Sequence, residues 1–64
     1  MGSEMPLEVG NRIKLKVTKK DLGVEKGDLG TILRYLPEAP FPWEVKFDKG
    51  LLLYLGAHYL RKVG

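Results

Sequence analysis

Five of the positive charges in this 64-residue chain fall within nine residues, and no acidic residue interrupts them. The segment, residues 12–20, reads RIKLKVTKK and has Arg12, Lys14 and Lys16 at alternate positions. On a β-strand, alternate side chains lie on one face about 6.5 to 7 Å apart, on the order of the spacing between phosphates along one nucleic-acid strand. The predicted backbone-binding residues are therefore Arg12, Lys14, Lys16, Lys19, Lys20 and, if the first and last strands pair, Arg61.

A structural interpretation of the same segment stands beside this one. Outward-facing cations on a terminal strand keep its edge from pairing with another chain. The segment also has no aromatic residue, whereas proteins that bind single strands stack bases on aromatic side chains. Contacts to phosphates carry no base information, so we expect at most a weak sequence preference from such a surface.

Residues suited to catalysis or metal binding are too few to form a site. Ser3 is the only serine and His58 the only histidine, and there is no cysteine, so neither a catalytic triad nor a thiolate metal site can be assembled. Gly23, Gly27 and Gly30 lack the spacing and the following Lys-Ser/Thr of a phosphate-binding loop. We therefore expect a binding module with no enzymatic activity, cofactor, metal or small-molecule substrate.

Aromatic and leucine side chains form a second group of candidate binding residues. Residues 51–55 read LLLYL, so as a strand this segment has apolar side chains on both faces. A domain this small has one core, so one of these faces should be covered by a loop, a partner protein or a second copy of the chain. Tyrosine and tryptophan are also enriched in recognition surfaces. The predicted protein-binding residues are Tyr35, Phe41, Trp43, Leu52, Tyr54 and Tyr59.

Five short strands are predicted to position these side chains. Apolar alternation and β-forming residues between turns place the strands at residues 12–17, 29–36, 43–47, 51–55 and 59–63. In the first of them Ile13, Leu15 and Val17 should face inward. No segment has a helical period, and one long early loop followed by tight turns predicts an all-β fold, a single small five-stranded barrel.

The connections between these strands differ in length and stiffness. Leu22 and Val24 should anchor the irregular loop of residues 18–28, and Gly30 marks a bulge or a close approach of two backbones. Three prolines stiffen the loop of residues 37–42. Residues 48–50 suit a hairpin turn, and residues 56–58 suit a short 3-10 turn before the last strand.

The glycine turns resemble those of a known group of proteins. The chain contains Lys26-Gly27-Asp28-Leu29-Gly30-Thr31-Ile32 and then Val45-Lys46-Phe47-Asp48-Lys49-Gly50, which resemble the K-G-D-x-G-T and V-x-F-D-x-G signature of small SH3-like barrels. That group includes one of the small proteins of photosystem I, the variable subunit of ferredoxin–thioredoxin reductase, KOW modules and bacterial domains of unknown function. The resemblance extends from about residue 10 to residue 63 and implies the SH3-like barrel. The photosystem and reductase members imply an accessory subunit of a larger enzyme.

A second resemblance is to the SH3 domains of eukaryotes. Residues 22–28 resemble their loop-and-turn segment, and residues 54–60 resemble their Y-I-P-S-N-Y-V segment, in which Tyr54 and Tyr59 match positions that line the proline groove. Gly56 replaces the groove proline, and residues 13–17 lack the aromatic opening of the family. The apolar side chains on both faces of residues 51–55 and the group of aromatic residues make protein binding the first functional hypothesis, with nucleic-acid binding and an accessory role as alternatives.

Composition predicts one soluble domain. At 44% hydrophobic and 30% charged residues, the chain is too apolar for disorder and too interrupted by charge to cross a membrane. We expect an N-terminal tail over residues 1–9, of which Met1 to Glu4 are native or were added for expression, and a barrel over residues 10–64. No signal peptide pattern opens the chain, which favours the cytoplasm, and the lack of glutamine suits a heat-loving source.

Overall fold

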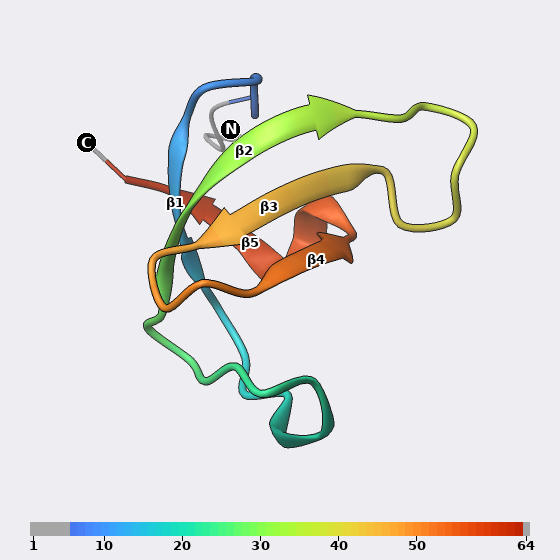
Figure 1. Ribbon diagram of the computed structural model, residues 1–64. Coiled ribbons are helices and arrows are strands. Elements are labelled where there is room, and N and C mark those ends of the chain that lie inside the picture. Colours follow the sequence, from blue (N-terminus) through green and yellow to red (C-terminus); the bar gives the residue numbers. More distant parts are fainter. Residues whose placement is uncertain (1–5, 64) are drawn as a thin grey trace.

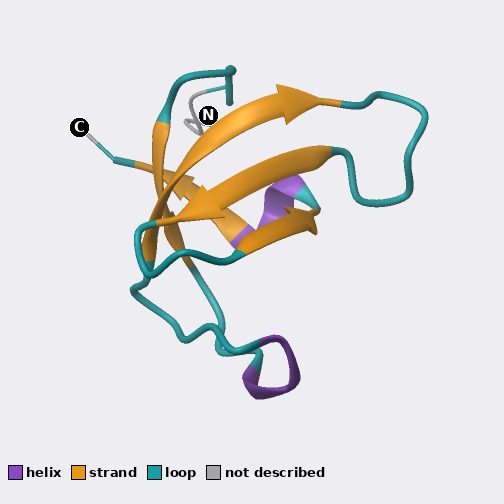
Figure 2. Ribbon diagram, viewed as in Figure 1, coloured by secondary structure: helices purple, strands orange, loops and turns teal. Residues whose placement is uncertain are grey.

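The computed structural model describes residues 6–63, which form an all-β fold (Figures 1 and 2). Its strands are β1 (Arg12–Leu15), β2 (Leu29–Tyr35), β3 (Trp43–Phe47), β4 (Leu52–Leu55) and β5 (Leu60–Lys62). They form an antiparallel sheet in the order β4-β3-β2-β1-β5, and two 3-10 turns, η1 (Lys20–Leu22) and η2 (Ala57–Tyr59), lie in the connections. The predicted fold class is confirmed, and the arrangement fits a small SH3-like barrel.

The core comes from the inward-facing residues of the bent sheet. In β1 the alternation is as predicted, with Ile13 and Leu15 buried and Arg12 and Lys14 exposed. Burying one large apolar side chain contributes about 1.5 to 3 kcal/mol, so the buried cluster is the main source of stability. It consists of Ile13, Leu15, Val24, Ile32, Val45, Phe47, Leu55 and Leu60, with Leu7, Trp43, Leu53 and Tyr59 packed against it.

At Gly30 the backbone of β2 lies very close to the backbone of its neighbour β3. A Cβ atom at this position would lie 2.9 Å from the carbonyl oxygen of Lys46 and 3.0 Å from Cγ1 of Val45. Of the two roles predicted for Gly30, the structure shows the close approach of backbones. The bulge lies further along β2, between Ile32 and Arg34, where the register with β3 shifts.

Two predictions about the first loop are wrong. Val17 is exposed and not inward-facing, because β1 ends at Leu15 and the strand alternation does not continue beyond it. Leu22 lies in η1 and is 40% exposed, so it does not anchor the loop. Val24 does, because it is fully buried and its carbonyl oxygen accepts a hydrogen bond of 2.9 Å from the amide of Lys19.

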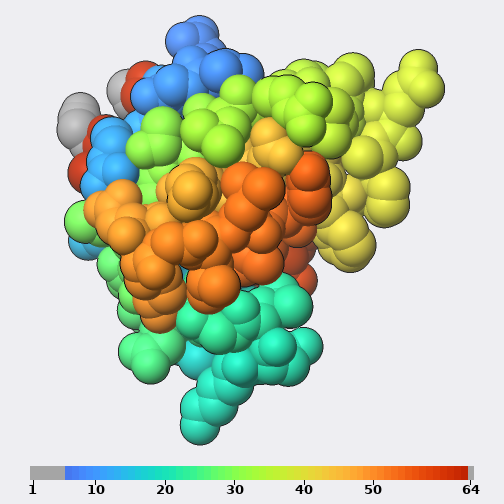
Figure 3. Space-filling view, viewed as in Figure 1, coloured from blue at the N-terminus to red at the C-terminus, as the bar shows by residue number. Residues whose placement is uncertain are grey.

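Two loops project from different parts of the barrel (Figures 1 and 3). Residues 16–28 carry η1, and residues 36–42 form the proline loop, which is closed by a 2.7 Å hydrogen bond from the amide of Leu36 to the carbonyl of Pro42. Residues 1–5, including Met1 to Glu4, lie outside the described part of the chain. Within residues 6–63 no helix is long and apolar enough to span a membrane.

Candidate functional site

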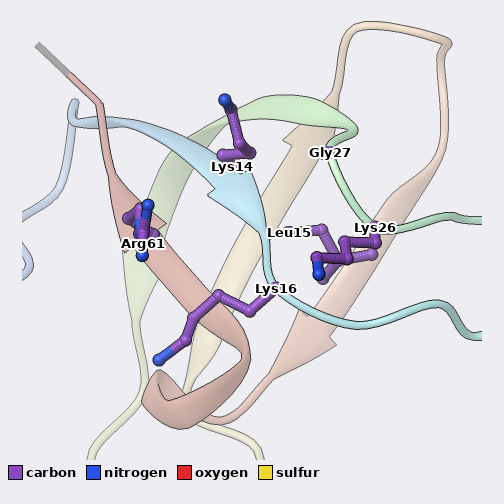
Figure 4. A pocket seen from close by; sticks show the side chains of 6 residues that line it. All are labelled: Lys14, Leu15, Lys16, Lys26, Gly27 and Arg61. Carbon is purple, nitrogen blue, oxygen red and sulfur yellow. The ribbon is translucent and has the colours of Figure 1, made fainter.

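Four positively charged side chains line one open cleft at the end of β1 (Figure 4). The cleft has a volume of about 680 Å³. Figure 4 shows Arg61 on β5 at one side of β1, and Lys26 with Gly27 on the loop at the other side. We call this the cationic cleft, and its lining residues are Lys14, Leu15, Lys16, Lys26, Gly27 and Arg61.

Backbone pairing brings the three segments of the cleft together. Lys14 lies directly opposite Arg61 in the register between β1 and β5. On the other side, the amide of Gly27 donates to the carbonyl of Leu15 at 2.8 Å, and the amide of Leu15 donates to the carbonyl of Asp28 at 2.9 Å. These two bonds hold the turn that carries Lys26 against the end of β1.

The four cations of the cleft lack carboxylate partners in the part of the chain that the structure describes. No acidic residue lines the cleft, and the ion pairs over residues 6–63 join Arg12 to Asp48, Arg34 to Glu44 and Lys49 to Asp28. Like charges directly opposite each other on neighbouring strands are destabilising. The Lys14 and Arg61 pair therefore lowers the stability of the free chain.

The strand order contradicts the edge-protection interpretation of the cations on β1. Edge protection requires a strand with one unpaired side, but β1 lies between β2 and β5 in the sheet. Cations on β1 therefore protect no edge, and this interpretation is wrong.

Three of the six cations predicted from the sequence reach the cleft, namely Lys14, Lys16 and Arg61. Arg12 does not, because its guanidinium donates to both carboxylate oxygens of Asp48, at 2.8 and 2.7 Å. This pairing holds the pKa of Asp48 below its usual value. Lys19 lies over the Tyr59 ring and Lys20 lies exposed in η1.

Lys26 was missed by the sequence analysis. It lies eleven residues after Leu15 in a turn of mixed charge, where no periodic pattern relates it to β1. Only the glycine at position 27, with a φ angle of 96° that favours glycine, signals the tight turn that returns this segment to the strand.

Four of the six predicted protein-binding residues lie on the sheet, two on each face, and the other two lie in the connections. Tyr35 pairs in register with Trp43, and their rings lie with centroids 4.4 Å apart and planes tilted by 35°. Tyr54 lies on the other face, because it is opposite Glu44, and successive residues of a strand alternate in direction. Leu52 lies two residues before Tyr54 and shares its face. Phe41 lies exposed in the proline loop, and Tyr59 lies half-buried in η2.

A closed polar network occupies the face that carries Tyr54. Glu44 is buried, accepts hydrogen bonds from Arg34 at 2.9 and 3.2 Å, and accepts one from the Tyr54 hydroxyl at 2.6 Å. Hydrogen bonding to Arg34 and then to Tyr54 lowers the pKa of Glu44, and the same Glu44 bond raises the pKa of Tyr54. The polar end of Tyr54 is therefore satisfied within the chain.

Comparison with known proteins supports the fold. The NMR structure of Bacillus subtilis protein YorP is similar with a TM-score of 0.72, covering 97% of this chain and 75% of that one. Sequence identity over the match is 20%, so the likeness shows the fold and leaves function to the site itself. No protein-family model matches the chain, and no curated protein matches it.

Proposed function

We propose that this chain is a non-catalytic binding module that holds the phosphate backbone of a nucleic acid in the cationic cleft. The observation that supports this proposal is that four exposed cations from three segments line one cleft that has no carboxylate in its lining. The arrangement costs the free chain stability through the Lys14 and Arg61 repulsion, and a bound polyanion removes that cost.

The spacing of the cleft cations suits a nucleic acid better than an acidic protein. Lys14 lies on β1 and Lys16 directly follows this strand, two residues further along, and Arg61 lies beside Lys14 on β5. A nucleic acid carries one charge per nucleotide at a regular interval, whereas carboxylates on a folded protein have no fixed interval. Lysine binds phosphate as a point charge, and the guanidinium of Arg61 has the forked geometry that binds a phosphate through two hydrogen bonds.

A nuclear magnetic resonance titration tests the proposal. The ¹⁵N-labelled chain is titrated at low salt with oligonucleotides of mixed sequence, once as a duplex and once as a single strand. We expect the largest amide shifts at Lys14, Leu15, Lys16, Gly27 and Arg61. Absence of shifts with both oligonucleotides would refute the proposal, as would shifts concentrated at the Tyr35 and Trp43 pair.

The Tyr35 and Trp43 pair supports a second candidate, binding of a second copy of the chain. Tyr35 and Phe41 are 48% and 52% exposed, the Tyr35 ring lies against Trp43, and Phe41 lies in the closed proline loop. Exposed aromatic groups of this kind anchor protein interfaces. Sedimentation velocity at increasing concentration should show a dimer that Tyr35→Ala disrupts. A monomer at every concentration excludes this candidate and leaves the first untouched.

A further inference from the structure

We infer that the nucleic acid is single-stranded and that His58 is the platform on which one of its bases stacks. This inference rests on the proposed function, because it concerns the same bound backbone. It adds a ligand class and a contact residue that the cationic cleft alone does not specify.

Two neighbouring aromatic rings, those of His58 and Tyr59, lie close to Lys16 of the cleft. The amide of Lys16 donates a 2.8 Å hydrogen bond to the carbonyl of Tyr59, which ties η2 to the residue that follows β1. The rings of His58 and Tyr59 lie with their centroids 4.1 Å apart and their planes tilted by 38°. The ammonium of Lys19 lies 4.6 Å from the centroid of the Tyr59 ring. Two adjacent aromatic rings and a further cation therefore lie next to the Lys16 end of the cleft.

His58 is the accessible member of this pair of rings. Tyr59 is half-buried and packs against the core, whereas His58 is exposed. The imidazole also lies against Gly56, since a Cβ there would come within 3.0 Å of its Cε1 and 3.1 Å of its Nδ1. Gly56 thus leaves the space in which the His58 ring rests, and the ring is supported by Tyr59 and by the backbone.

Such a platform can distinguish a single strand from a duplex. In a duplex the faces of the bases are covered by neighbouring base pairs, so an aromatic ring beside the backbone gains nothing from them. In a single strand the faces are free, and stacking on an aromatic side chain is worth roughly 5- to 150-fold in affinity per base. Residues 12–20 contain no aromatic residue, and the rings near this segment come from η2, about forty residues away.

Fluorescence anisotropy with four labelled probes tests the inference on the full chain. The probes are an oligothymidylate of about 12 nucleotides, an abasic strand of the same length, a duplex of the same length and a polyglutamate peptide of matched charge. At equal salt we expect the oligothymidylate to bind at least about 5-fold more tightly than the other three probes. His58→Ala should remove this advantage over the abasic strand, whereas His58→Phe should retain it. Leu33→Ala, which removes an exposed apolar side chain of β2 outside the cleft, should change neither affinity.

Different binding results would overturn the stacking inference and the proposed nucleic-acid binding. Equal, salt-dependent binding of oligothymidylate and abasic strand overturns the stacking inference and leaves backbone binding in place. An unchanged advantage in His58→Ala likewise overturns the assignment of His58. Failure of all three nucleic acids to bind refutes the proposed function itself, as does polyglutamate binding as tightly as oligothymidylate.

Discussion

Replacing Lys26 by alanine tests whether the nucleic acid is attracted by the cations of the cleft or by the net charge of the whole chain. Lys26 is exposed and lines the cleft, and no carboxylate pairs with it among residues 6–63, so its removal deletes one phosphate contact and breaks no ion pair of the fold. The matched control is Lys46→Ala. Lys46 is also exposed, but it lies on β3 between Thr31 and Leu52, outside the cleft.

The expected effect is a change in the salt dependence of binding. For a single strand, log K falls against log salt with a slope of about −0.7 per phosphate contact, so four cations give about −2.8 and three give about −2.1. Between 50 and 200 mM salt the wild-type chain should then lose about 50-fold in affinity, and Lys26→Ala about 18-fold. Lys46→Ala should keep the wild-type slope.

Oligothymidylate affinities measured by anisotropy at five salt concentrations give the three slopes. Circular dichroism first establishes that both variants retain the wild-type fold. Equal slopes for Lys26→Ala and Lys46→Ala would mean that net charge and not the cleft attracts the ligand, since both variants lose the same charge. A wild-type slope near zero would refute the electrostatic reasoning altogether.

Three further substitutions test the stability arguments. Lys14→Gln removes a like-charge contact, so in low salt the free energy of unfolding in urea should rise by about 0.2 to 1 kcal/mol, and a fall would contradict the repulsion. Gly30→Ala sets a Cβ 2.9 Å from the carbonyl oxygen of Lys46, and overpacking of this kind costs about 1 to 3 kcal/mol. The thermal midpoint should fall by about 4 °C or more, and an unchanged midpoint would exclude the close approach. Because Arg34 lowers the pKa of Glu44, the carboxylate stabilises the fold above its unfolded pKa, and this stability is lost as pH falls from the ordinary value of 4.5 toward the lower folded value. Thermal midpoints of Glu44→Gln should therefore decline less steeply in this acidic range than those of wild type.

The sheet could be predicted because its signals are local. Alternation within residues 12–15 and 43–47 requires only that neighbouring side chains lie on opposite faces, and both segments are strands. In the first of them the predicted inward residues Ile13 and Leu15 are buried. The prediction failed where the chain leaves the sheet. Val17 continues the alternating pattern in sequence, but β1 ends at Leu15 and Val17 is exposed.

The candidate site could be predicted only in part, because it depends on contacts between distant segments. The alternate lysines at the end of β1 identified one wall of the cleft. Arg12 belongs to the same alternating row, yet Asp48, thirty-six residues away, pairs with it. Lys26 and His58 join the site through backbone hydrogen bonds at Gly27 and Tyr59, and no pattern within either segment indicates them.

Added salt should raise the stability of the free chain and lower its affinity for a nucleic acid, and both effects depend on cations of the cleft. In the free chain, added salt screens the repulsion between Lys14 and Arg61 and so favours folding. In the complex, added salt competes with the phosphates and weakens binding. A cation that serves only the fold behaves differently, as Arg12 does, because its attraction to Asp48 is weakened by salt in the absence of any ligand. The repulsion between Lys14 and Arg61 therefore lowers the stability of the free chain, and binding of an anion in the cleft, as proposed above, would offset this loss.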